Sequence, residues 1–184
     1  MSQHDSPHQN GVNGTSAPAS AQPTLDMNAQ FKDARLLILG GTGFLGKIFW
    51  ILMLHRYPEV GKIFLLVRKS KTETSQQRFW STIATSEALQ PLRDTYGDKL
   101  EDFLKEKIVA IDGDVSLPLC GIDIEPLKGT IDAVVNVAGV VDFNPPIDEA
   151  IEANAGGALI LVDLSKALGN APLMHTSTCY TVGN

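Results

Sequence analysis

The chain has 184 residues, 43% hydrophobic and 20% charged, a composition typical of one globular domain of ordinary size. Its 15 Lys and Arg against 21 Asp and Glu give a formal charge of −6, which argues against a nucleic-acid-binding surface. Cys120 and Cys179 are too far apart for a metal motif and too few for a disulfide framework, so we interpret both as reduced.

Residues 1–33 differ in composition from the rest of the chain. They are rich in Ser, Gln, Asn, Pro, Gly and Ala without an apolar period, so they cannot bury enough surface to offset their ordering entropy. We predict a disordered leader there, with His4 and His8 solvated rather than bound to metal. No secretory signal is visible, and the longest apolar run, residues 48–54, is far shorter than the roughly 20 residues that span a bilayer. A cytoplasmic location is the expectation.

From residue 34 onward, short apolar runs alternate with longer amphipathic stretches. The apolar runs predict five buried strands, at residues 35–40, 62–68, 107–114, 131–139 and 172–178. Helices are predicted at 41–58 and 147–168, and residues 70–106 form a crossover longer than a single helix. Strands alternating with helices predict an α/β fold with a parallel sheet covered on both faces, because parallel strands need long crossovers.

A glycine-rich turn follows the first predicted strand. Gly41, Gly43 and Gly46 satisfy Gly-x-Gly-x-x-Gly, while Gly40, Gly43 and Gly46 satisfy the looser Gly-x-x-Gly-x-x-Gly. Such a turn lets the backbone approach a pyrophosphate, toward which the next helix points its unpaired N–H groups. The position between a strand and a helix favours a dinucleotide site over a tight turn without a ligand. The expected contact residues are Gly40, Gly41, Thr42, Gly43, Phe44, Leu45 and Gly46.

The end of the second predicted strand indicates which dinucleotide is bound. Binders of NAD(H) usually place Asp or Glu there, to hold the ribose hydroxyls. Here Arg68 and Lys69 occupy this region, and the first acid is Glu73. The Arg side chain offers a planar donor fork that suits a 2′-phosphate. NADP(H) is therefore the predicted cofactor, and a solvated basic turn is the alternative.

Together these segments resemble a known family. The sequences at residues 36–69, 107–115, 134–168 and 175–184 are similar, in this order, to the extended short-chain dehydrogenase/reductases. Within these they look most like fatty acyl-CoA reductases of the male-sterility type and the related thioester-reductase domains. The combination of "LLVRK", the long insert, "DGDV", "VDFNPP" and "STCY" carries the likeness. It implies a Rossmann-type, doubly wound parallel sheet of about five strands in the order 3-2-1-4-5.

The resemblance also implies roles for further residues. Asp114 and Val115 would lie beside the adenine, although Asp114 is equally well explained as a turn cap. The small residues at the end of the fourth strand would leave room for the cofactor; they are Val137, Ala138 and Gly139. Asn154 matches a family Asn that helps to organise the site, and the alternative is a helix residue without a role.

For the reaction, the resemblance implies that a nicotinamide hydride attacks the thioester carbonyl of a long-chain acyl-CoA or another acyl thioester. A Tyr, a Lys and a Ser or Thr hydroxyl would serve the developing oxyanion. The alignment places Thr178 at the hydroxyl position, with Ser177 as the alternate. Tyr180 follows the fifth strand too closely to lie on the next helix. No tyrosine of the chain has Lys four residues later.

We therefore expect residues 34–184 to form part of the NADP-binding domain of a fatty acyl-CoA reductase that gives aldehyde or alcohol. We expect the chain to be inactive alone and its fifth strand to expose an unpaired edge. The alternative is a non-catalytic NADP(H)-binding sensor or interaction module. No metal is implied. The charges of residues 70–106 are interpreted as a solvated face, with a grip on acyl-CoA or membrane as the alternative. Peripheral membrane association of a full-length enzyme stays open.

Overall fold

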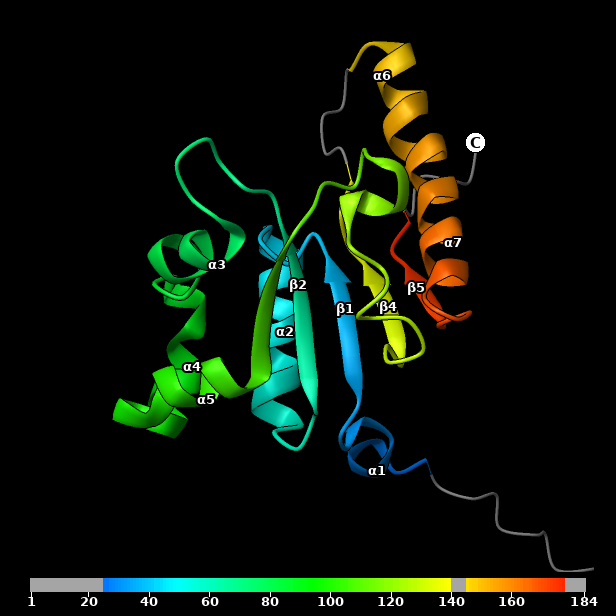
Figure 1. Ribbon diagram of the computed structural model, residues 1–184. Helices are drawn as coiled ribbons and strands as arrows, with labels where there is room; N and C mark the ends of the chain where they lie inside the picture. Colours follow the sequence, from blue (N-terminus) through cyan, green and yellow to red (C-terminus); the bar gives the residue numbers. More distant parts are fainter. Residues whose placement is uncertain (1–24, 140–144, 178–184) are drawn as a thin grey trace, which may run out of the picture.

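The computed structural model describes residues 25–139 and 145–177 of the chain (Figure 1). A parallel sheet of five strands lies at its centre, in the order β3-β2-β1-β4-β5. The strands are β1 (Arg35–Leu39), β2 (Lys62–Val67), β3 (Ile108–Asp112), β4 (Ala133–Asn136) and β5 (Leu173–His175). The predicted α/β architecture and its strand order are thus confirmed.

Helical segments connect the strands and cover both faces of the sheet (Figure 1). The helices are α1 (Met27–Phe31), α2 (Phe44–Arg56), α3 (Ser75–Arg78), α4 (Gln90–Tyr96), α5 (Leu100–Lys107), α6 (Ile147–Ile151) and α7 (Gly157–Ala167). Two π-helical turns adjoin them, at Phe79–Ile83 and Glu152–Gly156, and 3₁₀ turns lie at Glu87–Leu89, Gly97–Lys99 and Pro118–Gly121.

The strands alternate their side chains between two cores, as a sheet covered on both faces requires. Leu36 and Ile38 of β1 face the core that holds α2 and the insert, residues 70–106. Leu37 and Leu39 face the second core, which α7 and the segment after β3 complete. The insert contributes buried apolar side chains to the first core, and these are Phe79, Ile83, Leu89, Leu92, Leu100 and Leu104. Part of the insert is therefore core, with its charges on the outer surface.

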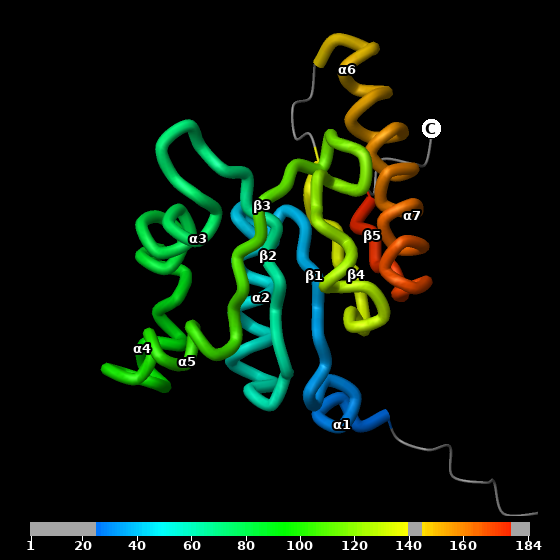
Figure 2. The backbone as a smooth tube through the Cα atoms, viewed as in Figure 1, coloured from blue at the N-terminus to red at the C-terminus, as the bar shows by residue number. Residues whose placement is uncertain are grey.

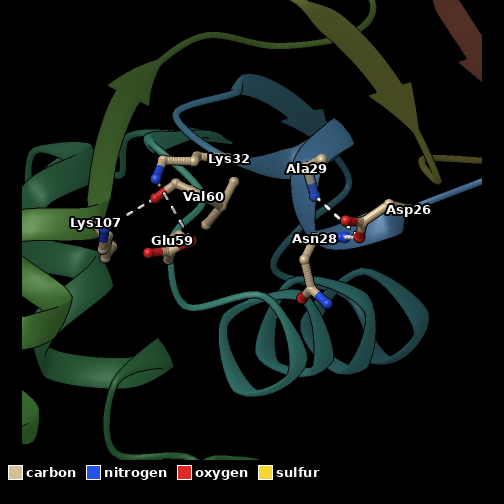
Figure 3. A network of polar contacts seen from close by, with 7 residues as sticks. All are labelled: Asp26, Asn28, Ala29, Lys32, Glu59, Val60 and Lys107. Atoms are coloured by element: carbon tan, nitrogen blue, oxygen red, sulfur yellow. Dashed lines mark hydrogen bonds and ion pairs between the residues drawn. The ribbon is translucent and has the colours of Figure 1, made fainter.

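Part of the expected leader has structure. Asp26 caps α1, because its Oδ1 accepts hydrogen bonds from the backbone N–H of Asn28 at 3.0 Å and of Ala29 at 3.3 Å (Figure 3). Lys32 pairs with Val60 in an antiparallel bridge. These contacts hold residues 26–32 against the rest of the domain, although their composition alone predicts disorder. Residues 1–24 lie outside the described part of the chain, and their disorder stays a prediction.

Among the described residues, β5 is the last strand, and one of its faces carries an exposed apolar side chain. β5 pairs with β4, and Met174, which aligns with Val135, is 48% exposed. Val135 faces the first core, so Met174 points to the side of the sheet on which α2 lies. An apolar side chain of β5 is therefore exposed on this face of the described sheet. Within residues 25–139 and 145–177, no helix is long and apolar enough to span a membrane.

Candidate dinucleotide-binding site

Most of the candidate cofactor-binding residues lie in turns at the carboxyl edge of the sheet. Figure 2 shows the chain leaving β1, β2, β3 and β4 at the same edge. In the sequence, these four strands are followed by the glycine loop, Arg68, Asp114 and residues 137–139, in that order. β1 connects to β2 on one side and has β4 as its neighbour on the other. This is the topological switch point, where open parallel sheets bind their ligands.

Two glycines of the loop are required by the backbone itself. Gly40 has φ +80°, and a Cβ on it would lie 2.5 Å from the backbone N of Ala138. A Cβ on Gly46 would overlap the Gly40 carbonyl oxygen and lie 2.7 Å from Gly41 Cα. Gly43 N–H donates to the Gly40 carbonyl at 3.0 Å and closes the turn. The loop is thus pressed between the end of β4 and the first turn of α2.

Gly43 has a different environment. It is exposed with φ −73°, and a Cβ on it would meet the Gly40 carbonyl oxygen at 3.4 Å, an ordinary van der Waals contact within the described structure. The fold therefore gives little reason for glycine at this position. A pyrophosphate that must approach the backbone would give one.

The N-terminus of α2 is suited to an anion. The helix has 13 residues, and in the described structure no side chain caps Gly43 at its start and no acid lies in its first turn. Phe44 and Leu45 are 83% and 53% exposed, so the first turn of the helix lies at the surface of the described structure. Unpaired N–H groups and the positive end of the helix dipole here favour a bound phosphate.

The basic end of β2 lies next to the turn after β3. Arg68 is largely exposed, and its Nη1 lies 3.9 Å from Asp114 Oδ2. Lys69 is also exposed. Arg78, in the insert, donates from Nη1 to the Arg68 carbonyl at 2.7 Å and so fixes the backbone from which the Arg68 side chain extends. Sequence reasoning assigned no role to Arg78, since its contact depends on how the insert folds back.

Asp114 caps its own turn and also faces Arg68. Its Oδ1 accepts hydrogen bonds from Ser116 N–H at 3.0 Å and from Ser116 Oγ–H at 2.8 Å. These bonds, and then the nearby Arg68 cation, hold the pKa of Asp114 below its ordinary value. Oδ2 is directed at Arg68, and Val115 packs on the second core. The turn-cap interpretation is correct, and it leaves one carboxylate oxygen for a ligand.

A buried amide orders the turn after β4. Asn136 is 2% exposed; its Oδ1 accepts from Ala138 N–H at 3.2 Å and its Nδ2 donates to the Ala138 carbonyl at 3.1 Å. Nδ2 also lies 3.1 Å from His175 Nδ1 on β5. Val137 and Ala138 are half-buried and Gly139 is exposed. Asn136 thus ties the small-residue turn to the end of β5. A polar residue inside an apolar run was the sequence signal for it.

The expected catalytic positions are only partly visible. Ser177 is exposed and follows β5 by two residues, at the same edge of the sheet. Thr178 lies outside the described residues. Asn154 is exposed and lies within the π-helical turn between α6 and α7, a kind of irregularity that often occurs at functional sites. Among residues 25–139 and 145–177, no three His, Cys, Asp or Glu side chains gather as metal ligands do.

Comparison with known proteins gives consistent matches. Residues 38–184 match the family model described as male sterility protein. The chain is 33% and 35% identical to the probable fatty acyl-CoA reductases 4 and 5 of Arabidopsis thaliana, over 82% and 83% of its own length. Among solved structures, it is similar to the reductase domain of a non-ribosomal peptide synthetase from Mycobacterium tuberculosis, with 25% identity and TM-score 0.60. That match covers 79% of this chain and 33% of the other. The chain spans about a third of the length of the curated relatives it matches.

Proposed function

The chain belongs to the male sterility protein family, and on that premise we propose that it forms the NADP(H)-binding part of a fatty acyl-CoA reductase. A nicotinamide cofactor follows from the family and from the similar reductase domain. The observation that carries the proposal is Gly43, which is exposed at an uncapped helix N-terminus where the fold tolerates a Cβ. Close approach of the cofactor to the backbone would explain why this position is glycine, whereas packing within the protein does not.

The preference for the phosphorylated cofactor rests on Arg68. Its guanidinium lies at the carboxyl end of β2, near Asp114 in the turn after β3, and the described turn after β2 presents Lys69 rather than an acid as its neighbour. Two cations at the ribose position attract a 2′-phosphate, whereas NAD(H) would gain nothing from them. Asp114 Oδ2, 3.9 Å from Arg68, is the acceptor we assign to the adenine amine.

The proposed substrate is a long-chain acyl-CoA, after the acyl-CoA reductases that the chain resembles over four fifths of its length. Thr178, or Ser177 as its alternate, would donate a hydrogen bond to the thioester carbonyl as hydride arrives. No tyrosine of the 184 residues has Lys four positions later. We therefore expect the chain to bind cofactor without reducing acyl-CoA by itself. Steady NADPH oxidation by this chain with palmitoyl-CoA would contradict the expectation that it binds cofactor without reducing acyl-CoA.

The direct test of the proposed site is Gly43→Ala. A methyl group there meets the Gly40 carbonyl oxygen at 3.4 Å, so we expect the variant to fold, with a small loss of stability from alanine at a helix N-cap. The methyl group occupies the path of the pyrophosphate, so we expect NADPH affinity to fall at least tenfold. Titration followed by NADPH fluorescence measures the affinity, and thermal unfolding measures the stability.

Gly157→Ala is the matched control. Gly157 begins α7, has helical φ −56°, and within the described structure no atom lies within 4 Å of a Cβ built on it. The same added methyl group should leave NADPH affinity unchanged. Equal affinities in Gly43→Ala and Gly157→Ala would contradict the proposed site, as would a wild-type chain that binds neither NADPH nor NADH.

A further inference from the structure

Trp50, two turns into α2, is linked to the glycine loop by a hydrogen bond. Its side chain is fully buried, and the indole Nε1–H donates to the Gly41 carbonyl at 3.0 Å. Gly41 is itself buried, and a Cβ on it would lie 2.8 Å from Leu65 Cδ2 and 3.7 Å from Trp50 Cδ1. The carbonyl of Gly41 is therefore directed into the core and held there by one donor.

The direction of the Gly41 carbonyl sets the direction of the Thr42 N–H, because both belong to the same peptide group. In a planar trans peptide the C=O and the N–H point to opposite sides. With the Gly41 oxygen held in the core by Trp50, the N–H of Thr42 points away from the core, toward the open side of the loop. That is the side from which a pyrophosphate would approach the N-terminus of α2.

The insert holds the tryptophan ring in place. Phe79, fully buried in the insert's π-helical turn, lies with its ring centroid 6.2 Å from that of Trp50 at an interplanar angle of 47°. Phe79 in turn meets Trp80 edge to face, at 5.1 Å and 85°. Lys47 of α2 adds a second contact, with its Nζ donating to Ser86 Oγ at 3.4 Å. The packing of the insert thus reaches the glycine loop through the side chain of Trp50.

We propose that Trp50 is a positioning residue for the cofactor loop: through the Gly41 carbonyl it orients the Thr42 amide for the pyrophosphate, and through Phe79 it makes that orientation depend on the insert. The role rests on the proposed function, because it presumes a dinucleotide on the loop. If Trp50 only filled the core, replacing it would affect stability alone. Loss of its N–H would then leave the conformation of the glycine loop and the NADPH affinity unchanged.

The test removes the N–H and keeps the ring. Trp50 is replaced by benzothienylalanine, in which sulfur takes the place of the indole N–H. We expect the Thr42 amide resonance of the ligand-free, ¹⁵N-labelled protein to shift and its hydrogen exchange to quicken. NADPH affinity should fall about fivefold, the effect of one hydrogen bond. The control is the same replacement at Trp80. Its ring meets Phe79, and its face lies 5.9 Å from Lys105 Nζ. This replacement should change neither the Thr42 amide nor the NADPH affinity.

A second variant covers the case in which the analogue folds badly. Phe79→Leu loosens the ring contact without removing the indole donor, and we expect the same Thr42 shift with about a twofold loss of NADPH affinity. An unchanged Thr42 amide in both variants overturns the proposal. So does equal loss of affinity on replacing Trp80. If the wild-type chain binds no NADPH, the proposed function fails, while the Thr42 amide of the ligand-free protein still decides whether Trp50 positions the loop.

Discussion

Replacing Arg68 by Ala tests cofactor choice with little disturbance of the fold. The Arg68 side chain is 74% exposed, and its Nη1 approaches Asp114 Oδ2 no closer than 3.9 Å. Exposed pairs of this kind contribute about 0–1 kcal/mol to stability. Arg78 holds the Arg68 backbone carbonyl at 2.7 Å, a contact that the substitution leaves in place. We therefore expect the unfolding midpoint of Arg68→Ala to stay close to that of the wild type.

The effect on NADPH should be much larger. A hydrogen bond to a charged group contributes about 1.5–3 kcal/mol, which corresponds to a roughly tenfold to hundredfold change in affinity. Because the site is exposed and screened by salt, the lower half of this range is expected at physiological ionic strength. NADH has no 2′-phosphate, so its affinity should change less than threefold. Calorimetric titration with each cofactor, at two salt concentrations, measures the difference.

Arg56→Ala provides the charge-matched control for this prediction. Arg56 is exposed at the last position of α2, at the opposite end from the glycine loop, and its loss lowers the net charge equally. We expect both cofactors to bind Arg56→Ala as they bind the wild type. If Arg68→Ala and Arg56→Ala weaken NADPH binding equally, or if Arg68→Ala weakens NADPH and NADH alike, the assignment of Arg68 to the 2′-phosphate is refuted.

The remaining predictions concern stability and pH. Leu37→Ala, at a fully buried position of β1, should lower the free energy of unfolding by about 2–5 kcal/mol, measured in urea. Burial raises the pKa of the Cys120 thiol to about 11; since the thiol ionises more easily when unfolded, stability should fall between about pH 9 and 11, and Cys120→Ala should remove that loss. The lowered pKa of Asp114 gives stability that is present above its unfolded pKa and lost as the pH falls through its folded pKa, so acid unfolding of Asp114→Asn should show a shallower loss below about pH 4. Parallel pH profiles of each variant and the wild type would contradict the last two.

The parts of the fold that follow from local pattern could be predicted. β1 is apolar from Leu36 to Leu39 because both of its faces are buried, and the glycines that follow are demanded by a positive φ at Gly40 and by close backbone approach at Gly46. Such constraints act within a few residues of the chain. They therefore appear in the sequence as a strand, a glycine turn and a helix in the expected order.

The parts that depend on distant contacts could not be predicted. Trp50 looks like any apolar helix residue until its N–H is seen to meet the Gly41 carbonyl. The structure of residues 26–32 depends on contacts such as the ring of Phe31 against Tyr57, with centroids 5.0 Å apart. From the sequence, Asp114 could be a turn cap or a ligand contact. In the structure one carboxylate oxygen caps a turn while the other faces Arg68, so the two roles do not exclude each other.

We expect a nicotinamide dinucleotide to lie across the glycine loop of this chain. A titration of the ¹⁵N-labelled chain with NADPH, followed by the backbone amide resonances, tests this binding site directly. We expect saturable shifts at residues 40–46, at Arg68 and Asp114 and at residues 137–139. We expect little change at residues 90–107, which include the C-terminal half of the insert. Absence of saturable shifts, or shifts centred away from the carboxyl edge of the sheet, would contradict it.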